Sequence, residues 1–281
     1  MWTLILLASA AMAADQTILV HGHRGARARF PENTIPAFSY AISVGVDVLE
    51  LDLAVTKDNV LVVSHDPVLE APVCKGPTLN DVKATIRELT LAQVREWDCG
   101  AVQNPLFKEQ KTVPGTKMPT LDEVLALAKK GNFEFNIETK IFKAQPELTP
   151  SPEEFAALLV KAIEKRKLVK RCIIQSFDFR TLIAARKLNP RIRLAALYER
   201  GSKDFVTLSK EAANAEIVSP QYRVVTAEKV KAAHDAGLQV VPWTANNPQD
   251  WDALIDARAD AIITDDPAAL LQHLRARKLH K

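Results

Sequence analysis

The stretch VDVLELDLAVTKDNVLVVSHDP, residues 46–67, holds two apolar runs separated by a short polar turn. In the first run, 46–53, Glu50 and Asp52 interrupt the apolar residues with the two-residue period of a β-strand. The turn at 57–59 is too short to contain a crossover helix before the second run, 60–65. The two runs are therefore predicted to pair as an antiparallel hairpin, which brings His65 near Asp52.

Short β-branched runs recur on both sides of this stretch and alternate with helical patterns. Apolar residues at i, i+3 and i+4 mark the helices, several of which begin at a capping residue such as Thr120, Ser151 or Thr226. The predicted barrel strands are 18–22, 46–53, 133–139, 173–176, 193–197, 216–218, 239–242 and 261–264. These repeats favour an α/β fold of the TIM (β/α)8 barrel type, although an open doubly wound sheet has the same local pattern.

One long segment does not follow the repeat. Residues 67–119 are rich in proline, glycine and polar residues, with at most one short helix around 91–97. We expect an insertion after the second barrel strand that covers the barrel mouth and shapes the binding pocket. Residues 15–281 are then predicted to form one barrel domain, since such barrels commonly use about 250 residues.

The amino terminus resembles a targeting segment. Residues 1–14 form an apolar run that ends in small residues, as in a signal peptide, although the usual basic residues are missing. A buried first strand or helix is the alternative. The run is too short to cross a bilayer, which needs about 20 apolar residues. We therefore expect a periplasmic or secreted protein without a stable membrane span.

The chain contains three cysteines, so they cannot all pair. Cys74 and Cys99 lie in one loop-rich region, whereas Cys172 begins an apolar, strand-like run. In an oxidising compartment we expect a Cys74–Cys99 disulfide and a buried free thiol at Cys172. Three structural thiols in a cytosolic protein remain the alternative.

Charge excludes some classes of partner. The 37 basic and 34 acidic residues give a net charge of +3 and form no long block of one sign. This distribution predicts no nucleic-acid partner, and the sequence makes no prediction of oligomeric state.

Several strand ends carry residues suited to chemistry. Glu50 and Asp52 lie two apart on one strand and share its inward face, where two bare carboxylates would repel each other. A hard divalent ion, Mg²⁺ or Ca²⁺, would neutralise them. Glu138 and Lys140 repeat this spacing on the next barrel strand, and a salt bridge from Lys140 to a carboxylate without metal is the alternative.

Two histidines lie near these carboxylates in the predicted barrel. His23 and Arg24 follow the first strand, and His65 ends the hairpin. Imidazoles with pKa values near neutrality can serve as a general acid and a general base. Gln175 and Trp243 end later strands on the same rim and are weaker candidates for substrate contact. Asn33 or Thr34 is expected to cap the first helix, and Asp178 and Asp265 are expected to cap later ones.

The order and spacing of these motifs resemble the glycerophosphodiester phosphodiesterases. The resemblance covers nearly the whole mature chain, and its motifs are HRG (23–25), PENT (31–34), ELD (50–52), TKD (56–58), HD (65–66), NIETK (136–140), QSFD (175–178), WTAN (243–246) and TDDP (264–267).

The resemblance implies a phospholipase C-like TIM barrel that cleaves small glycerophosphodiesters into sn-glycerol 3-phosphate and an alcohol. It implies one divalent metal ion held by Glu50, Asp52 and Glu138. In this family His23 and His65 would be the acid–base pair, and Arg24 and Lys140 would bind the phosphate.

Three rival functions remain. His21 and His23 on one strand also suit a metal-dependent amidohydrolase, but the middle strands 173–176 and 193–197 carry no ligand histidines. A lipid-cleaving phospholipase of the same superfamily is a nearer rival. A non-catalytic binding protein would be expected to have lost a catalytic histidine or a metal carboxylate, and this chain has kept them.

Overall fold

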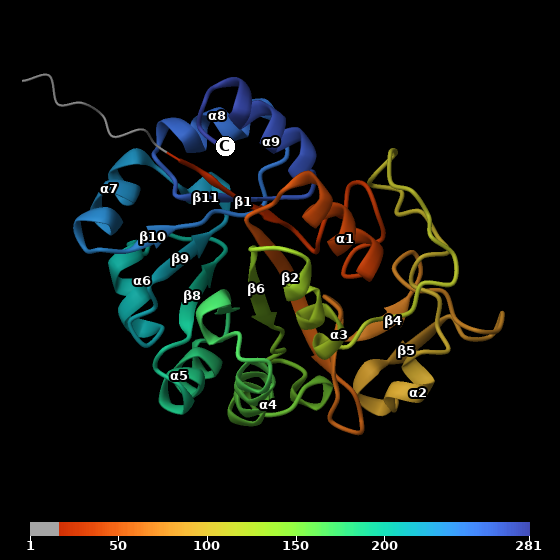
Figure 1. Ribbon diagram of the computed structural model, residues 1–281. Helices are drawn as coiled ribbons and strands as arrows, with labels where there is room; N and C mark the ends of the chain where they lie inside the picture. The colour runs from red at the N-terminus through yellow and green to blue at the C-terminus, as the bar shows by residue number, and fades with distance from the viewer. Residues whose placement is uncertain (1–16) are drawn as a thin grey trace, which may run out of the picture.

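The computed structural model describes residues 17–281. Eight parallel strands form a nearly closed barrel in the spatial order β10-β9-β8-β7-β6-β2-β1-β11, and helices surround it (Figure 1). These strands are β1 (Leu19–Gly22), β2 (Val48–Val55), β6 (Glu134–Thr139), β7 (Cys172–Ser176), β8 (Arg193–Tyr198), β9 (Ile217–Pro220), β10 (Gln239–Val240) and β11 (Ala261–Thr264). The predicted TIM barrel is confirmed.

Backbone hydrogen bonds complete the ring where β10 and β11 meet. The amide of Asp260 donates to the carbonyl of Val240 at 3.0 Å, and the amide of Ile263 donates to that of Pro242 at 2.9 Å. These bonds span the gap in the strand ladder, so all eight strand ends surround a common axis and the open doubly wound sheet is excluded.

The outer layer consists of helices whose apolar faces pack on the strands. It contains α1 (Ile35–Val44), α3 (Leu121–Leu125), α4 (Pro152–Lys165), α5 (Phe179–Leu188), α6 (Phe205–Glu211), α7 (Ala227–Asp235), α8 (Pro248–Asp256) and α9 (Pro267–Ala276). Short 3₁₀ turns are η1 (Ile86–Glu88), η2 (Ala126–Lys130), η3 (Pro146–Leu148), η4 (Val169–Arg171) and η5 (Tyr222–Val224). The predicted caps Thr120, Ser151 and Thr226 each accept a hydrogen bond from the first turn of their helix.

Strand alternation separates two cores. On β2, Leu49, Leu51 and Leu53 point outward into the large core between the strands and the helices. A second, small core that includes Ile173 and Ile217 fills the barrel interior. Polar side chains that share the inward face must then lie at one end of the barrel, above this apolar plug.

The hairpin predicted beside β2 is present. Strand β3 (Leu61–Val63) pairs antiparallel with β2, with Leu53 opposite Val63. Its last hydrogen bond runs from the amide of Ser64 to the carbonyl of Asp52 at 3.0 Å. His65 follows directly, so the pairing places it next to Asp52 as predicted.

Residues 67–119 contain more structure than the sequence indicated. They include the antiparallel pair β4 (Val68–Glu70) and β5 (Lys83–Thr85), the short helix α2 (Leu91–Val94) and their own small apolar cluster with Trp97. The segment packs beside the barrel, next to α1 and α3 (Figure 1). Described residues 67–119 supply no side chain to the wall of the main cavity, so the prediction that the insertion shapes this pocket directly was wrong.

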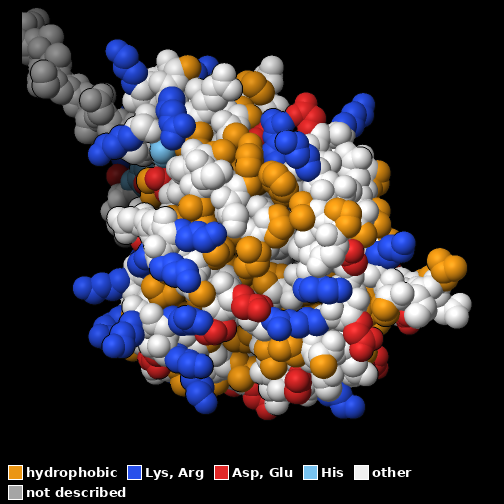
Figure 2. All heavy atoms as spheres, turned by 45° about the vertical axis from the view of Figure 1, so that its right-hand side comes forward, with side chains coloured by type: hydrophobic (Ala, Val, Ile, Leu, Met, Phe, Trp, Pro, Cys, Tyr) orange, Lys and Arg blue, Asp and Glu red, His pale blue; other side chains and the backbone are white. Residues whose placement is uncertain are grey.

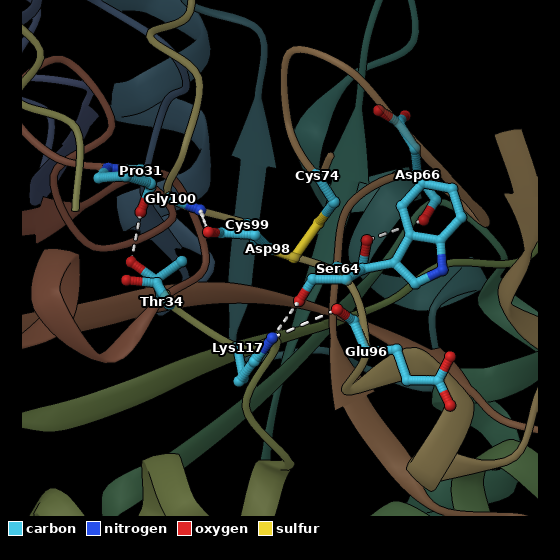
Figure 3. Close-up of a disulfide and its surroundings, with 12 residues drawn as sticks. Pro31, Thr34, Ser64, Asp66, Cys74, Glu96, Asp98, Cys99, Gly100 and Lys117 are labelled. Atoms are coloured by element: carbon cyan, nitrogen blue, oxygen red, sulfur yellow. Dashed lines mark hydrogen bonds between the residues drawn. A yellow bond between two sulfur atoms is a disulfide. The ribbon is translucent and has the colours of Figure 1, made fainter. Parts of the chain in front are cut away.

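The predicted disulfide joins Cys74 to Cys99, and Cys172 is buried with a free thiol. Figure 3 shows the disulfide beside the hairpin end at Ser64 and the loop at Thr34. Residues of all three segments line one small cavity. The disulfide thus closes a loop within the insertion, next to the segments that precede α1 and follow β3.

The surface agrees with the charge pattern of the sequence. Figure 2 shows basic and acidic side chains intermixed over the lower part of the face it presents. Within residues 17–281, none of the helices has the length and apolarity needed to cross a bilayer.

Candidate active site

A cavity of about 470 Å³ lies at the carboxyl ends of the barrel strands. Its lining draws on β2, β6, β7, β8 and β11 and on the segments that follow β1, β3, β6, β7, β8 and β10. Every site residue predicted from the sequence lies on its wall: His23, Arg24, Glu50, Asp52, His65, Glu138, Lys140, Gln175 and Trp243. The fold therefore collects in one place residues that span most of the sequence.

Three buried carboxylates form the base of the cavity. Each of Glu50, Asp52 and Glu138 offers an oxygen, and these atoms lie within 4.8 Å of one another. The ladder between β2 and β6 places Asp52 directly opposite Glu138. Like charges at such separations repel strongly in a low-dielectric site, so the triad needs cations nearby.

The protein supplies two cations to this triad. Nζ of Lys140 lies 2.8 Å from Oε1 of Glu138 and 4.0 Å from Oδ1 of Asp52, and Nε of Arg24 lies 3.3 Å from Oδ2 of Asp52. The salt bridge expected in the metal-free alternative is therefore present. Two cations do not balance three carboxylates, which leaves an excess negative charge in a buried site.

Proton affinities reflect this imbalance. Burial and then the charge of Asp52 raise the pKa of Glu50 well above its usual range. Burial also opposes ionisation of Asp52, but Arg24, His65 and Lys140 outweigh it and hold the pKa of Asp52 low. A carboxylate trio of this kind, with oxygen donors alone, suits a hard divalent ion.

Amide groups hold the triad in place. Glu50 accepts hydrogen bonds from the backbone amide of Arg24 at 2.9 Å and from Nε2 of Gln175 at 2.7 Å. Oε1 of Gln175 accepts in turn from Nδ2 of Asn136 at 2.9 Å. Both ends of the Gln175 amide thus have protein partners, which makes it a support for Glu50.

The first helix begins beside the same triad. Thr34 caps α1, because its side chain accepts from the amide of Ala37. Asn33 instead turns toward the site, where its Nδ2 donates to Oδ2 of Asp52 at 2.9 Å. Of the two candidate caps, Thr34 is therefore the cap and Asn33 supports Asp52.

His23 is held by residues that follow the neighbouring strand β11 and the strand β10. Its Nδ1 lies 2.5 Å from Oδ1 of Asp265, and Nδ2 of Asn246 donates to Oδ2 of the same carboxylate at 2.8 Å. Burial lowers the pKa of His23, an effect that Asp265 partly opposes. The imidazole is thus fixed in orientation through Nδ1.

The expected helix cap at Asp265 was wrong. Asp266 caps α9, accepting from the amide of Ala269 at 3.3 Å, while Asp265 turns inward to His23. Asp178 does cap α5, as predicted.

His65 follows β3 and lines the same cavity as His23. Its Nδ1 is 2.8 Å from Oδ1 of Asp66, and its side chain is 32% exposed. Each histidine therefore has a carboxylate at Nδ1. This pairing leaves Nε2 of both rings to accept or give a proton.

An aromatic pair forms another part of the wall. The rings of Phe177 and Trp243 meet edge to face, with centroids 5.5 Å apart. Nε1 of Trp243 donates to the carbonyl of Ser219 at 2.8 Å, so its only donor is already used. Trp243 can offer a substrate its ring surface but no hydrogen bond.

Several further residues line the wall that were not predicted from the sequence: Arg27, Leu197, Glu199, Thr244 and Ile263. The two-residue period of β8 could have found Leu197 and Glu199, which share the inward face with Ala195. Arg27 lies in a loop that follows no period, so the sequence carried no signal for it.

His21 does not join this group. It lies on β1, two residues before His23, and is 2% exposed. Burial, and then the charge of Arg193, lower its pKa to about 3. The histidine pair required by the amidohydrolase alternative therefore does not meet at the cavity.

Known proteins share both sequence and fold with this chain. A family model described as "Glycerophosphoryl diester phosphodiesterase family" matches residues 23–269. A glycerophosphodiester phosphodiesterase of Caldanaerobacter subterraneus subsp. tengcongensis is 34% identical over 259 residues, which cover 92% of this chain and 98% of that protein. One from Bacillus subtilis is 33% identical, over 91% of this chain and 86% of its own length.

A solved structure supports the same assignment. It is a crystal structure from Silicibacter pomeroyi, described as "Putative glycerophosphoryl diester phosphodiesterase". It superposes on this chain with a TM-score of 0.88 at 28% identity. The match covers 95% of this chain and 96% of the other. With the family match across most of its length, the chain belongs to the glycerophosphoryl diester phosphodiesterase family and is a phosphodiesterase of that class.

Proposed function

We propose that the chain hydrolyses small glycerophosphodiesters to sn-glycerol 3-phosphate and an alcohol with the help of one divalent metal ion, Mg²⁺ or Ca²⁺. The observation that carries this proposal is the meeting of a carboxylate triad, two carboxylate-paired histidines and two cations in one cavity. The names of the relatives agree with it.

Glu50, Asp52 and Glu138 would hold the metal ion. When bound, such an ion supplies positive charge that stabilises the negative charge developing on phosphoryl oxygens. The fit rests on the buried excess of carboxylate charge, which two protein cations do not balance.

The protein's own groups would supply the remaining chemistry. Arg24 and Lys140 are buried cations on the cavity wall and would bind the phosphoryl oxygens. His23 and His65 would transfer protons through Nε2, one to the leaving alcohol and one from the attacking group. Asp265 and Asp66 would keep each ring in the tautomer that this task requires.

The test is an assay of glycerol 3-phosphate release from glycerophosphocholine and glycerophosphoethanolamine. It is run with EDTA and with added Mg²⁺ or Ca²⁺. Metal-dependent release supports the proposal, and His23→Ala or His65→Ala should abolish turnover while the circular dichroism spectrum is retained. No release by folded protein with any metal would contradict it and direct the search to lysophospholipids or a binding role.

We also propose that the protein is periplasmic or secreted and that residues 15–281 form one domain. The Cys74–Cys99 disulfide supports an oxidising compartment. The signal peptide predicted at 1–14 lies outside the described residues. Expression of the full chain, fractionation and mass spectrometry of the mature amino terminus test it, and an intact Met1 on protein confined to the cytoplasm would contradict it.

A further inference from the structure

Arg27 is a third cation on the cavity wall, and no motif of the sequence pointed to it. It lies in the loop between β1 and α1, and its side chain is 15% exposed. Its charge is among the effects that lower the pKa values of His23 and Asp265. The charge of Arg27 thus acts on the His23–Asp265 pair, as that of Arg24 does. Of the three cations, only Arg24 and Lys140 form ion pairs with the triad among the described residues.

Glu32 holds two guanidinium groups together. Its Oε1 is 2.5 Å from Nη1 of Arg24, and its Oε2 is 2.8 Å from Nη2 of Arg27. Arg24 has a second carboxylate within reach in Asp52. Across residues 17–281, Arg27 forms an ion pair with Glu32 alone, so it is the less compensated of the two cations.

Arg27 has only the carboxylate that it shares with Arg24, so its positive charge can attract a further anion. Nε of Arg27 also has no hydrogen-bond partner among the described residues. A purely structural arginine would be expected to use more of its five donors on the protein. The ion pair with Glu32 fixes the position of the guanidinium but leaves hydrogen-bond donors of Arg27 unused.

The insertion supports Arg27 from outside. The ring of Phe107 lies 5.0 Å from Cζ of Arg27, and Nε2 of Gln110 donates to the carbonyl of Arg27 at 2.7 Å. Next to them, the amide of Lys111 donates to the carbonyl of Arg29 at 2.9 Å. Figure 1 shows this part of the insertion passing beside the segment that leads into α1. Residues 67–119 therefore act on the cavity through Arg27, although none of them lines it.

We propose that Arg27 is a third cationic contact for the phosphoryl oxygens of the substrate and that Phe107 and Gln110 are positioning residues for it. This inference rests on the proposed function and adds a binding residue to it. A guanidinium that binds the phosphoryl group in both the ground state and the transition state raises affinity more than turnover. Its loss should therefore appear in KM.

Arg27→Gln and Arg29→Gln form a matched pair for the test. Arg29 belongs to the same loop but binds Asp266 and Glu109 and does not line the cavity. We expect Arg27→Gln to raise KM for glycerophosphocholine about 10- to 100-fold, the effect of losing one charge-assisted hydrogen bond, with a smaller change in kcat. Arg29→Gln should keep the wild-type KM. Arg27→Lys should fall between wild type and Arg27→Gln, because it keeps the charge and loses the planar fork.

Phe107→Leu tests the support from the insertion. It should raise KM in the same direction as Arg27→Gln by a smaller factor and should add little to it in the double variant, because both act through one guanidinium. Additive effects in the double variant would contradict the positioning role.

Calorimetric titration with inorganic phosphate separates this inference from the proposed function. Weaker phosphate binding by Arg27→Gln than by Arg29→Gln supports the role of Arg27, even if the wild type cleaves none of the diesters tested. Equal phosphate affinities and equal KM values in the two variants would overturn it. Absence of diester cleavage by the wild type would count against the proposed function alone.

Discussion

Nδ1 of His23 lies 2.5 Å from Oδ1 of Asp265, although 242 positions separate the two residues in the chain. The contact exists because β1 and β11 are neighbours in the barrel, with Gly22 paired to Thr264. Asn246 holds the other carboxylate oxygen and also accepts from the amide of Asp265 at 2.9 Å. Three segments that are distant in sequence thus fix one imidazole.

Asp265→Asn should lower kcat by about 100-fold, because an amide no longer favours the tautomer with a proton on Nδ1 and a basic Nε2. The measurement is kcat for glycerol 3-phosphate release under saturating metal. Asp266→Asn is the control, since Asp266 caps α9 and binds Arg29 without contacting His23. A wild-type kcat in Asp265→Asn would refute the orienting role.

Glu138→Gln should abolish tight binding of Mg²⁺ or Ca²⁺, because it removes one charged ligand of the triad. Glu134→Gln is a matched control on the same strand and face, four residues earlier, where Glu134 binds Arg193. Isothermal titration with each metal should show binding in the control and not in Glu138→Gln. Equal metal affinity in both variants would exclude Glu138 from the ligand set.

Cys74→Ser with Cys99→Ser should destabilise the fold by about 3.5 kcal/mol, the chain-entropy value for a loop of 25 residues. Urea unfolding with and without reductant measures the difference. The folded variant should keep its kcat, since the disulfide and the rest of 67–119 do not line the cavity. A lower kcat in the fully folded double variant would show that the insertion controls the catalytic groups as well as substrate affinity.

His21 should make the protein sensitive to mild acid. In the folded chain the pKa of His21 is about 3, whereas the ordinary pKa of a histidine, taken for the unfolded chain, is 6.5. Between these two pH values the unfolded chain therefore binds more protons than the folded chain. The contribution of neutral, buried His21 to the free energy of unfolding is therefore complete above about pH 6.5 and is lost as the pH falls toward 3. Between pH 6.5 and 5 the expected loss is about 2 kcal/mol.

His21→Leu should remove this contribution and flatten the dependence of the unfolding free energy on pH. Urea unfolding at pH 7 and pH 5 compares the two proteins. If the variant loses as much stability as the wild type over this interval, another group causes the acid sensitivity.

The strand period explains why most of the site could be predicted. Glu50 and Asp52 on β2 share the inward face because successive side chains alternate, and the same holds for Glu138 on β6 and Lys140 directly after it. Since the ends of parallel strands meet at one rim, their proximity follows from the fold class. The antiparallel turn at 57–59 placed His65 by the same local reasoning.

The predictions that were wrong concern loops and the insertion, where the two-residue period of the barrel strands does not apply. Asp265 and Asp266 both suit a helix cap by composition, and their roles were decided by which of them faces His23 from the neighbouring strand. The insertion looked like a cover because it follows a strand end, but its own apolar cluster holds it beside the barrel.

Residue spacing within single segments was enough to predict the βα repeats, the hairpin and the inward-facing groups. Closure of the repeats into a barrel was settled by hydrogen bonds between strands far apart in the chain. Tertiary structure alone decided that Asp265 and Asn246 orient His23, that Glu32 joins Arg24 to Arg27, and that Phe107 lies against Arg27. These contacts join loops and strands far apart in the chain. Their partners are selected by barrel closure and packing, which no local pattern of residues encodes.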